Sequence, residues 1–174
     1  MHNRAEFWSP VPDWPQARLR GERVTVTPVP VVVAWWVSGD ATSFLARHGL
    51  SRALGPRDTT DDEKYALRYA PDRLLFVSAA PALDDFGSQA DGSAITDISD
   101  GMMIFDIQGE GTAELMAQGG EYPFAAAPGL ATESASLRFA SFRLAVMRRP
   151  NGWRLHIERP WAPALWHWLQ AHVD

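Results

Sequence analysis

The sequence predicts an α+β fold made of two pseudo-repeated β-α-β-β units with antiparallel or mixed sheets. Two internal correspondences and one alternating strand pattern support this prediction. In the first correspondence, residues 33–40 align with residues 103–110 at a shift of 70 residues. In both copies an apolar strand leads through a glycine and an acidic residue into a short helix, which is the signature of a repeated unit.

Each copy of this segment has the turn chemistry that its order of elements requires. A glycine permits the tight turn from strand to helix, and a carboxylate then lies at the helix N-terminus, where the helix dipole favours it. A second glycine follows at the expected C-cap. In order, these residues are Gly39, Asp40 and Gly49 in the first copy and Gly109, Glu110 and Gly119 in the second.

The second correspondence extends the repeat, because residues 65–77 align with residues 144–156 at a shift of 79 residues. Each copy is typical of two strands joined by a Pro-Asp or Pro-Asn turn. In the last strand, Arg154 and His156 alternate with apolar residues, which predicts a half-buried antiparallel strand with His156 on its solvent face. The order strand, helix, strand, strand therefore occurs twice.

The domain organisation follows from these repeats. We expect a Pro- and Trp-rich arm over residues 1–22 and a single domain over residues 23–174. That domain contains half-repeats at about 23–80 and 94–174, joined by an acidic linker at 81–93 that is rich in turn formers. A helix from about 161 to 172 closes the chain after Pro160, which suits a first-turn position.

The composition narrows the classes of protein. Apolar residues make up 46% of the chain, enough for a packed core, and the net charge of −5 with scattered arginines argues against nucleic-acid binding. The longest apolar stretch, residues 29–37, is too short to span a membrane. The chain has no Cys, so disulfides and thiolate nucleophiles are excluded. With no secretory signal evident, we expect a cytoplasmic protein.

The motifs of common enzyme sites are incomplete. Gly109-Glu110-Gly111 begins like a dinucleotide fingerprint, but Glu114 stands where the third glycine belongs. His167 and His172 lie about 140° apart around the last helix, too far to share one metal ion. The sequence therefore predicts no catalytic, cofactor-binding or metal-binding residue.

The aromatic residues indicate a partner surface instead. Trp8 and Trp14 lie in a Pro-rich arm that docks either on its own domain or on a partner. In the last helix, Trp166 points more than 90° away from the predicted core stripe and is expected to be an exposed interface residue. That stripe consists of Trp161, Ala164, Leu165, Trp168 and His172.

The second half of the chain resembles the sarcosine oxidase gamma-subunit family. The matching residues are Asp97-Ile98-Ser99, Gly109, Ala113, Leu115-Met116, Gly119, Phe124, Pro128-Gly129, Arg159 and the Trp-rich segment 165–169. The likeness covers about residues 94–170, and in the first half it rests on residues 71–75. The sequence departs from the family pattern at Ala70, Arg73-Leu74 and residues 121–123.

The resemblance implies a fold similar to the folate-binding domain of aminomethyltransferases. It also implies a non-catalytic accessory subunit of a heterotetrameric sarcosine oxidase or related N-methyl amine oxidase in one-carbon metabolism. Its partners would be alpha-, beta- and delta-type subunits, which would carry FAD, FMN, NAD and tetrahydrofolate. The expected interface residues are Trp8, Trp14, Arg159 and Trp166. The alternatives are a stand-alone folate-dependent aminomethyltransferase-like enzyme and a homodimeric binding module of the same fold.

Overall fold

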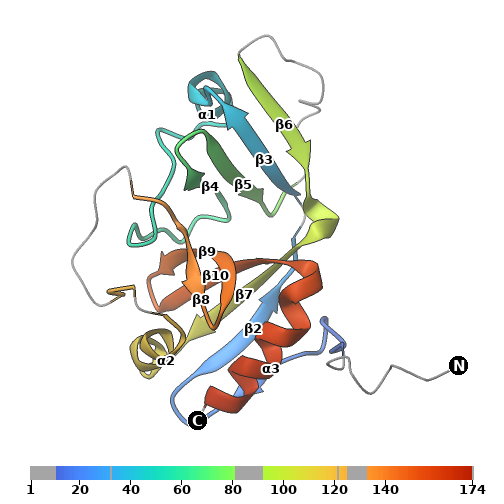
Figure 1. The fold of residues 1–174 in the computed structure, drawn as a ribbon, viewed down its shortest axis with the longest axis vertical. Helices are drawn as coiled ribbons and strands as arrows, with labels where there is room; N and C mark the ends of the chain where they lie inside the picture. The colour runs from blue at the N-terminus through green and yellow to red at the C-terminus, as the bar shows by residue number, and fades with distance from the viewer. Residues whose placement is uncertain (1–10, 32, 81–91, 121, 125–132, 174) are drawn as a thin grey trace, which may run out of the picture.

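Two antiparallel sheets form the centre of the molecule (Figure 1). The computed structural model describes residues 11–31, 33–80, 92–120, 122–124 and 133–173. Sheet A has the order β1 (Leu19–Arg20), β2 (Thr25–Val29), β7 (Met102–Gln108), β10 (Gly152–Glu158), β9 (Phe142–Arg149) and β8 (Ser136–Phe139). Sheet B has the order β4 (Lys64–Ala70), β5 (Arg73–Ser78), β3 (Val33–Gly39) and β6 (Ser93–Asp97). The predicted α+β class is confirmed.

The two repeats exchange strands between the sheets. In sheet B, β4, β5 and β3 belong to the first repeat, whereas β6 precedes the first strand of the second repeat. In sheet A, β9, β10 and β7 belong to the second repeat, whereas β2 precedes the first strand of the first. Each repeat thus supplies one strand to the sheet of the other, and neither half-repeat forms a sheet from its own strands alone.

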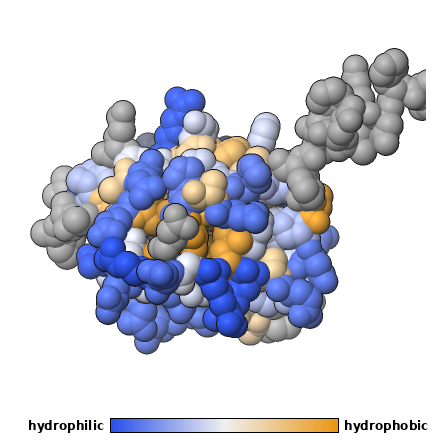
Figure 2. Space-filling model, turned by 90° about the horizontal axis from the view of Figure 1, so that it is seen from below, coloured by the Kyte–Doolittle hydropathy of each residue, from blue (hydrophilic) through white to orange (hydrophobic). Residues whose placement is uncertain are grey.

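The chain packs in four layers. Helices α2 (Thr112–Gly119) and α3 (Ala162–His172) contribute to the apolar cluster on one face of sheet A, and sheet B covers the other face. The short helix α1 (Thr42–Arg47) packs through Phe44 on the far side of sheet B. Strands β7 and β10 are consequently buried on both faces. Figure 2, viewed from below, shows a largely hydrophilic surface with hydrophobic residues gathered near its centre.

The turns from strand to helix match their predicted chemistry at Gly39 and Gly109, where φ is +92° and +120°. A side chain at Gly109 would collide with the backbone oxygen of Arg23. Asp40 accepts a hydrogen bond from the backbone N–H of Thr42 at 3.0 Å. Hydrogen bonding with the side chain of Thr42, and then with its backbone, lowers the pKa of Asp40. The predicted C-cap at Gly119 is wrong: that residue closes α2 in helical conformation, and the ring of Phe139 leaves no room there for a Cβ.

The residues of α3 that face the core are shifted by about one position along the sequence from the predicted stripe. Its buried residues are Ala162, Leu165, Trp166 and Leu169, and Trp161 lies outside the helix in the 3-10 turn η4 (Arg159–Trp161). Trp166 is only 7% exposed and Trp161 is 55% exposed, which reverses the prediction for both. Because this helix is apolar around most of its circumference, its sequence period does not fix which side faces the core.

Candidate functional site

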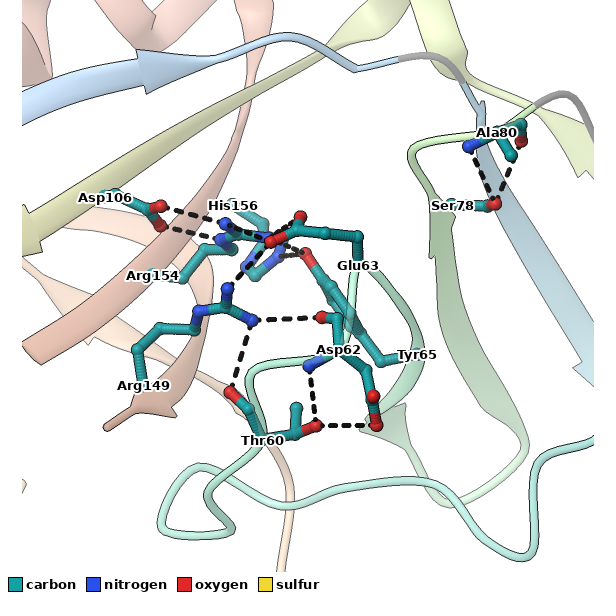
Figure 3. Close-up of polar contacts among 10 residues, drawn as sticks. All are labelled: Thr60, Asp62, Glu63, Tyr65, Ser78, Ala80, Asp106, Arg149, Arg154 and His156. Carbon is teal, nitrogen blue, oxygen red and sulfur yellow. Dashed lines mark hydrogen bonds and ion pairs between the residues drawn. The ribbon is translucent and has the colours of Figure 1, made fainter. Parts of the chain in front are cut away.

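A polar cluster lies between the two sheets, in a region otherwise filled by apolar residues (Figure 3). Asp106 comes from β7, Arg154 and His156 from β10, and Tyr65 from β4, while Glu63 immediately precedes β4. Arg154 and His156 are buried, at 2% and 1% exposure. This cluster is the main buried group of titratable side chains in the described part of the chain.

Arg154 binds two carboxylates, that of Asp106 in sheet A and that of Glu63 just before β4 of sheet B. Its Nε and Nη2 atoms donate to Asp106, directly opposite on β7, at 2.6 and 2.8 Å. Its Nη1 atom donates to Glu63 at 2.9 Å. Burial lowers the pKa of Arg154, but the hydrogen bonds to Asp106 and Glu63 outweigh it and raise that pKa above its ordinary value. The side chain is therefore a permanent cation that ties β4 to sheet A.

His156 and Tyr65 continue the cluster. The Nδ1 atom of His156 lies 3.2 Å from the carbonyl oxygen of Ala145, which only accepts, so Nδ1 carries the proton. Its Nε2 atom accepts from the hydroxyl of Tyr65 at 2.7 Å. Burial lowers the pKa of His156 to about 3 and raises that of Tyr65 to about 12. Both groups are neutral at pH 7.

This arrangement favours a structural role for the cluster over acid–base catalysis. A general base needs an accessible lone pair near its substrate, but the Nε2 lone pair of His156 is occupied by Tyr65. The predicted solvent-facing position of His156 is wrong, because sheet B covers the face of β10 that the alternation assigned to water. The cluster fixes the two sheets to each other, and the sequence pattern of β10 alone did not reveal it.

The motif Asp97-Ile98-Ser99 also has a structural role in this chain. Asp97 accepts hydrogen bonds from the backbone N–H and the hydroxyl of Ser99, at 2.8 and 2.6 Å. The same hydroxyl accepts from the backbone N–H of Ala34 in β3 at 2.9 Å. The motif thereby attaches the 3-10 turn η3 (Ser99–Gly101) to the first repeat.

Arg159 is similarly engaged within its own chain. Its Nε atom donates to the carbonyl oxygen of Asp100 at 2.6 Å, and Nη2 donates to that of Met102 at 3.2 Å. The side chain therefore connects η4 to the start of β7. The residue remains exposed, so its predicted interface role stays a prediction.

The predicted tryptophans do not form one surface. Trp8 lies outside the described residues. Trp14 is partly buried, and its ring lies 5.7 Å from those of Trp166 and Phe105. The arm thus docks on its own domain at Trp14, and β1 within it pairs with β2. The exposure from which we inferred an interface at Trp166 is wrong, since Trp14 and Phe105 enclose it.

Other candidate sites lack assembled chemistry in the described residues. An open cleft of about 620 Å³ lies between the start of α2 and the β9–β10 turn, and Glu110 is the one carboxylate residue among those described as lining it. No cluster of three or more His, Cys, Asp or Glu residues in the described ranges has the geometry to hold a metal ion. None of the described helices has the length and apolarity that a membrane span requires.

The structure shows one aromatic surface that sequence reasoning missed. Trp161 is exposed beside Phe142, with ring centroids 6.4 Å apart, at a hollow that Tyr69 also lines. Arg159-Pro160 was the available signal, because a proline there favours a separate turn before the helix and so removes Trp161 from the helical stripe.

Comparison with known proteins adds one finding. No protein-family model matches the sequence, and no curated protein matches it. Among solved structures, the chain is similar to one of the heterotetrameric sarcosine oxidase from Corynebacterium sp. U-96 in complex with pyrrole 2-carboxylate. The TM-score is 0.68 at 17% identity, covering 90% of this chain and 87% of that chain. This chain shares that fold.

Proposed function

We propose that this chain is a gamma-like, non-catalytic accessory subunit of a heterotetrameric sarcosine oxidase or a related N-methyl amine oxidase. The observation that carries the proposal is the structural likeness over nearly the full length of both chains. The two coverages imply that the matched chain is about as long as this one. The likeness therefore relates two chains of similar length, rather than this chain to one domain of a much longer subunit.

The interior of the molecule agrees with an accessory role. The buried titratable groups are paired with each other, and His156 has its Nε2 lone pair occupied by Tyr65. In this proposal the chain contributes surface to the complex. The alpha-, beta- and delta-type partners hold FAD, FMN, NAD and tetrahydrofolate, and the complex is cytoplasmic.

Co-expression tests the proposal. A tagged full-length chain would be produced together with candidate alpha-, beta- and delta-type subunits from its own genome, and the captured material would be examined for flavin absorbance and subunit ratio. We expect equal amounts of four subunits with bound flavin. A chain that elutes alone while the other three assemble without it would contradict the proposal. The tag without the chain serves as the control for non-specific capture.

Calorimetry separates the proposal from a stand-alone folate enzyme. Titration of the isolated chain with tetrahydrofolate is expected to give no saturable heat, because the pteridine-handling groups are assigned to a partner. Saturable binding with a one-to-one ratio would favour the aminomethyltransferase-like alternative instead.

A further inference from the structure

An exposed aromatic surface lies where the β8–β9 hairpin meets η4. Trp161 is one of two large hydrophobic residues that are strongly exposed among those described, the other being Val11. The hollow beside it measures about 340 Å³. We define the Trp161 surface by the residues that line this hollow together with one neighbouring arginine: Tyr69, Ser141, Phe142, Arg143, Glu158, Trp161 and Arg138. Exposed Trp and Arg are the residue types most enriched among binding hot spots.

Two arginines of this surface face each other, and neither forms an ion pair among the described residues. Arg138 on β8 lies directly opposite Arg143 on β9, and both are exposed. Neither makes an ion pair or side-chain hydrogen bond with any described residue. The backbone N–H of Val146 donates to the carbonyl oxygen of Ala135, so Ala135 and Val146 form a hydrogen-bonded pair of the antiparallel ladder. By alternation the arginines form a non-hydrogen-bonded pair, in which side chains lie closest.

This pair is unfavourable for the isolated fold. Like charges directly opposite on neighbouring strands destabilise a sheet. The chain has 21 acidic residues against 16 basic ones, so two opposed arginines are unusual for its overall charge. An acidic partner would turn this local cost into an attraction.

The turn that joins these strands is strained as well. Ala140 and Ser141 both have positive φ, +48° and +72°, in a two-residue hairpin loop. Such loops favour Asn or Gly, and a non-glycine residue in this conformation costs about 1 kcal/mol. The loop places Phe142 beside Trp161 and Arg143 at the rim. Two locally unfavourable features thus lie next to Trp161, the most exposed tryptophan among the described residues. This combination is typical of a surface kept for binding.

We propose that the Trp161 surface docks an acidic segment of a partner subunit, which inserts an apolar side chain beside Trp161 and pairs its carboxylates with Arg138 and Arg143. This inference rests on the proposed function and names the surface through which the subunit assembles. Glu158 also lines the hollow, and its charge repels carboxylates from that side. The acidic residues of the segment therefore lie on the Arg143 side.

Binding measurements with purified alpha-, beta- and delta-type subunits test the docking surface. The full chain would be titrated against each subunit at low and high salt. We expect Trp161→Ala and the double variant Arg138→Glu/Arg143→Glu each to raise the Kd for one subunit at least tenfold, about 1.4 kcal/mol. Salt should weaken the wild type and not the double variant. Arg18→Glu/Arg20→Glu makes the same charge change at exposed positions around β1 and should leave the Kd unchanged.

Each outcome decides the matter. If the wild type binds and all variants bind equally well, the docking surface is overturned while the proposed function stands. If the wild type binds no subunit, the proposed function fails, and this surface fails with it. The isolated chain provides a separate check: Arg138→Glu should raise the thermal midpoint by about 2 °C, because it replaces repulsion with a cross-strand pair. A lower midpoint would overturn the argument from the arginine pair.

Discussion

The hydroxyl of Tyr65 in β4 donates a hydrogen bond to Nε2 of His156 in β10 across 2.7 Å, and so joins sheet B to sheet A. Both groups are withdrawn from water, and both remain neutral because burial raises the pKa of Tyr65 and lowers that of His156. Together with Arg154, they make the packing of the two sheets specific as well as apolar.

Removing the hydroxyl of Tyr65 should destabilise the chain without emptying the core. In Tyr65→Phe, Nε2 of His156 loses its partner while it stays buried, and an unsatisfied buried acceptor costs about 1–3 kcal/mol. Urea denaturation at pH 7 measures the change in the free energy of unfolding. Tyr69→Phe is the control, since the Tyr69 hydroxyl makes no hydrogen bond within the described residues. Equal losses in both variants would contradict the role of the bond.

The buried His156 predicts a characteristic pH dependence. Its pKa falls from 6.5 to about 3 on folding because burial penalises the charged form. Between those values the unfolded state binds more protons, so stability is full above pH 6.5 and is lost as the pH falls toward 3. We expect a slope of about 1.4 kcal/mol per pH unit from this one group.

A comparison of variants separates the contribution of His156 to the pH dependence of stability from that of the carboxylates. Glu63 also has a lowered pKa, chiefly through its hydrogen bond with Arg154, and it adds to the loss at acid pH. The free energy of unfolding from pH 4 to 7 should depend less steeply on pH in His156→Gln than in the wild type. His167→Gln, at an exposed position of α3, should keep the wild-type slope.

The ion pair of Arg154 with Asp106 should contribute far more than a surface pair. The side chain of Arg154 is 3% exposed, so Asp106→Asn leaves a buried cation without one of its two carboxylates. We expect a loss of about 3–5 kcal/mol in the free energy of unfolding. Glu114→Gln removes the Arg23–Glu114 pair, whose side chains are 50% and 66% exposed, and should cost at most about 1 kcal/mol.

Trp161 and Trp166, five residues apart in sequence, should respond differently to truncation. Trp166 packs against Trp14 and Phe105, so Trp166→Ala should cost about 3–5 kcal/mol by leaving a cavity. Trp161→Ala should change stability by only about 0.5 kcal/mol, because the side chain is mostly exposed. Thermal unfolding of both variants by circular dichroism checks the contrast. A folded, fully stable Trp166→Ala would restore the interface hypothesis for that residue.

The order of elements was predictable because it depends on local chemistry. The turn glycines at 39 and 109, the strand pairs around Pro71 and Pro150, and the final helix all appear where the sequence placed them. Each depends on backbone conformation and polar contacts between neighbours in sequence, such as the bond from Thr42 to Asp40. The α+β fold predicted from the sequence is also the fold of the matched chain of heterotetrameric sarcosine oxidase.

The tertiary structure alone decided which surface each side chain meets. The exchange of β2 and β6 between sheets, the burial of His156 and the orientation of Trp166 all depend on elements far apart in the chain. A hydrophobic period of two or of 3.6 residues shows which side chains share one face of a strand or helix. It does not show which part of the molecule covers that face. Sheet B buries one face of β10, and Trp14 completes the pocket around Trp166, because apolar area is removed from water wherever two such faces meet.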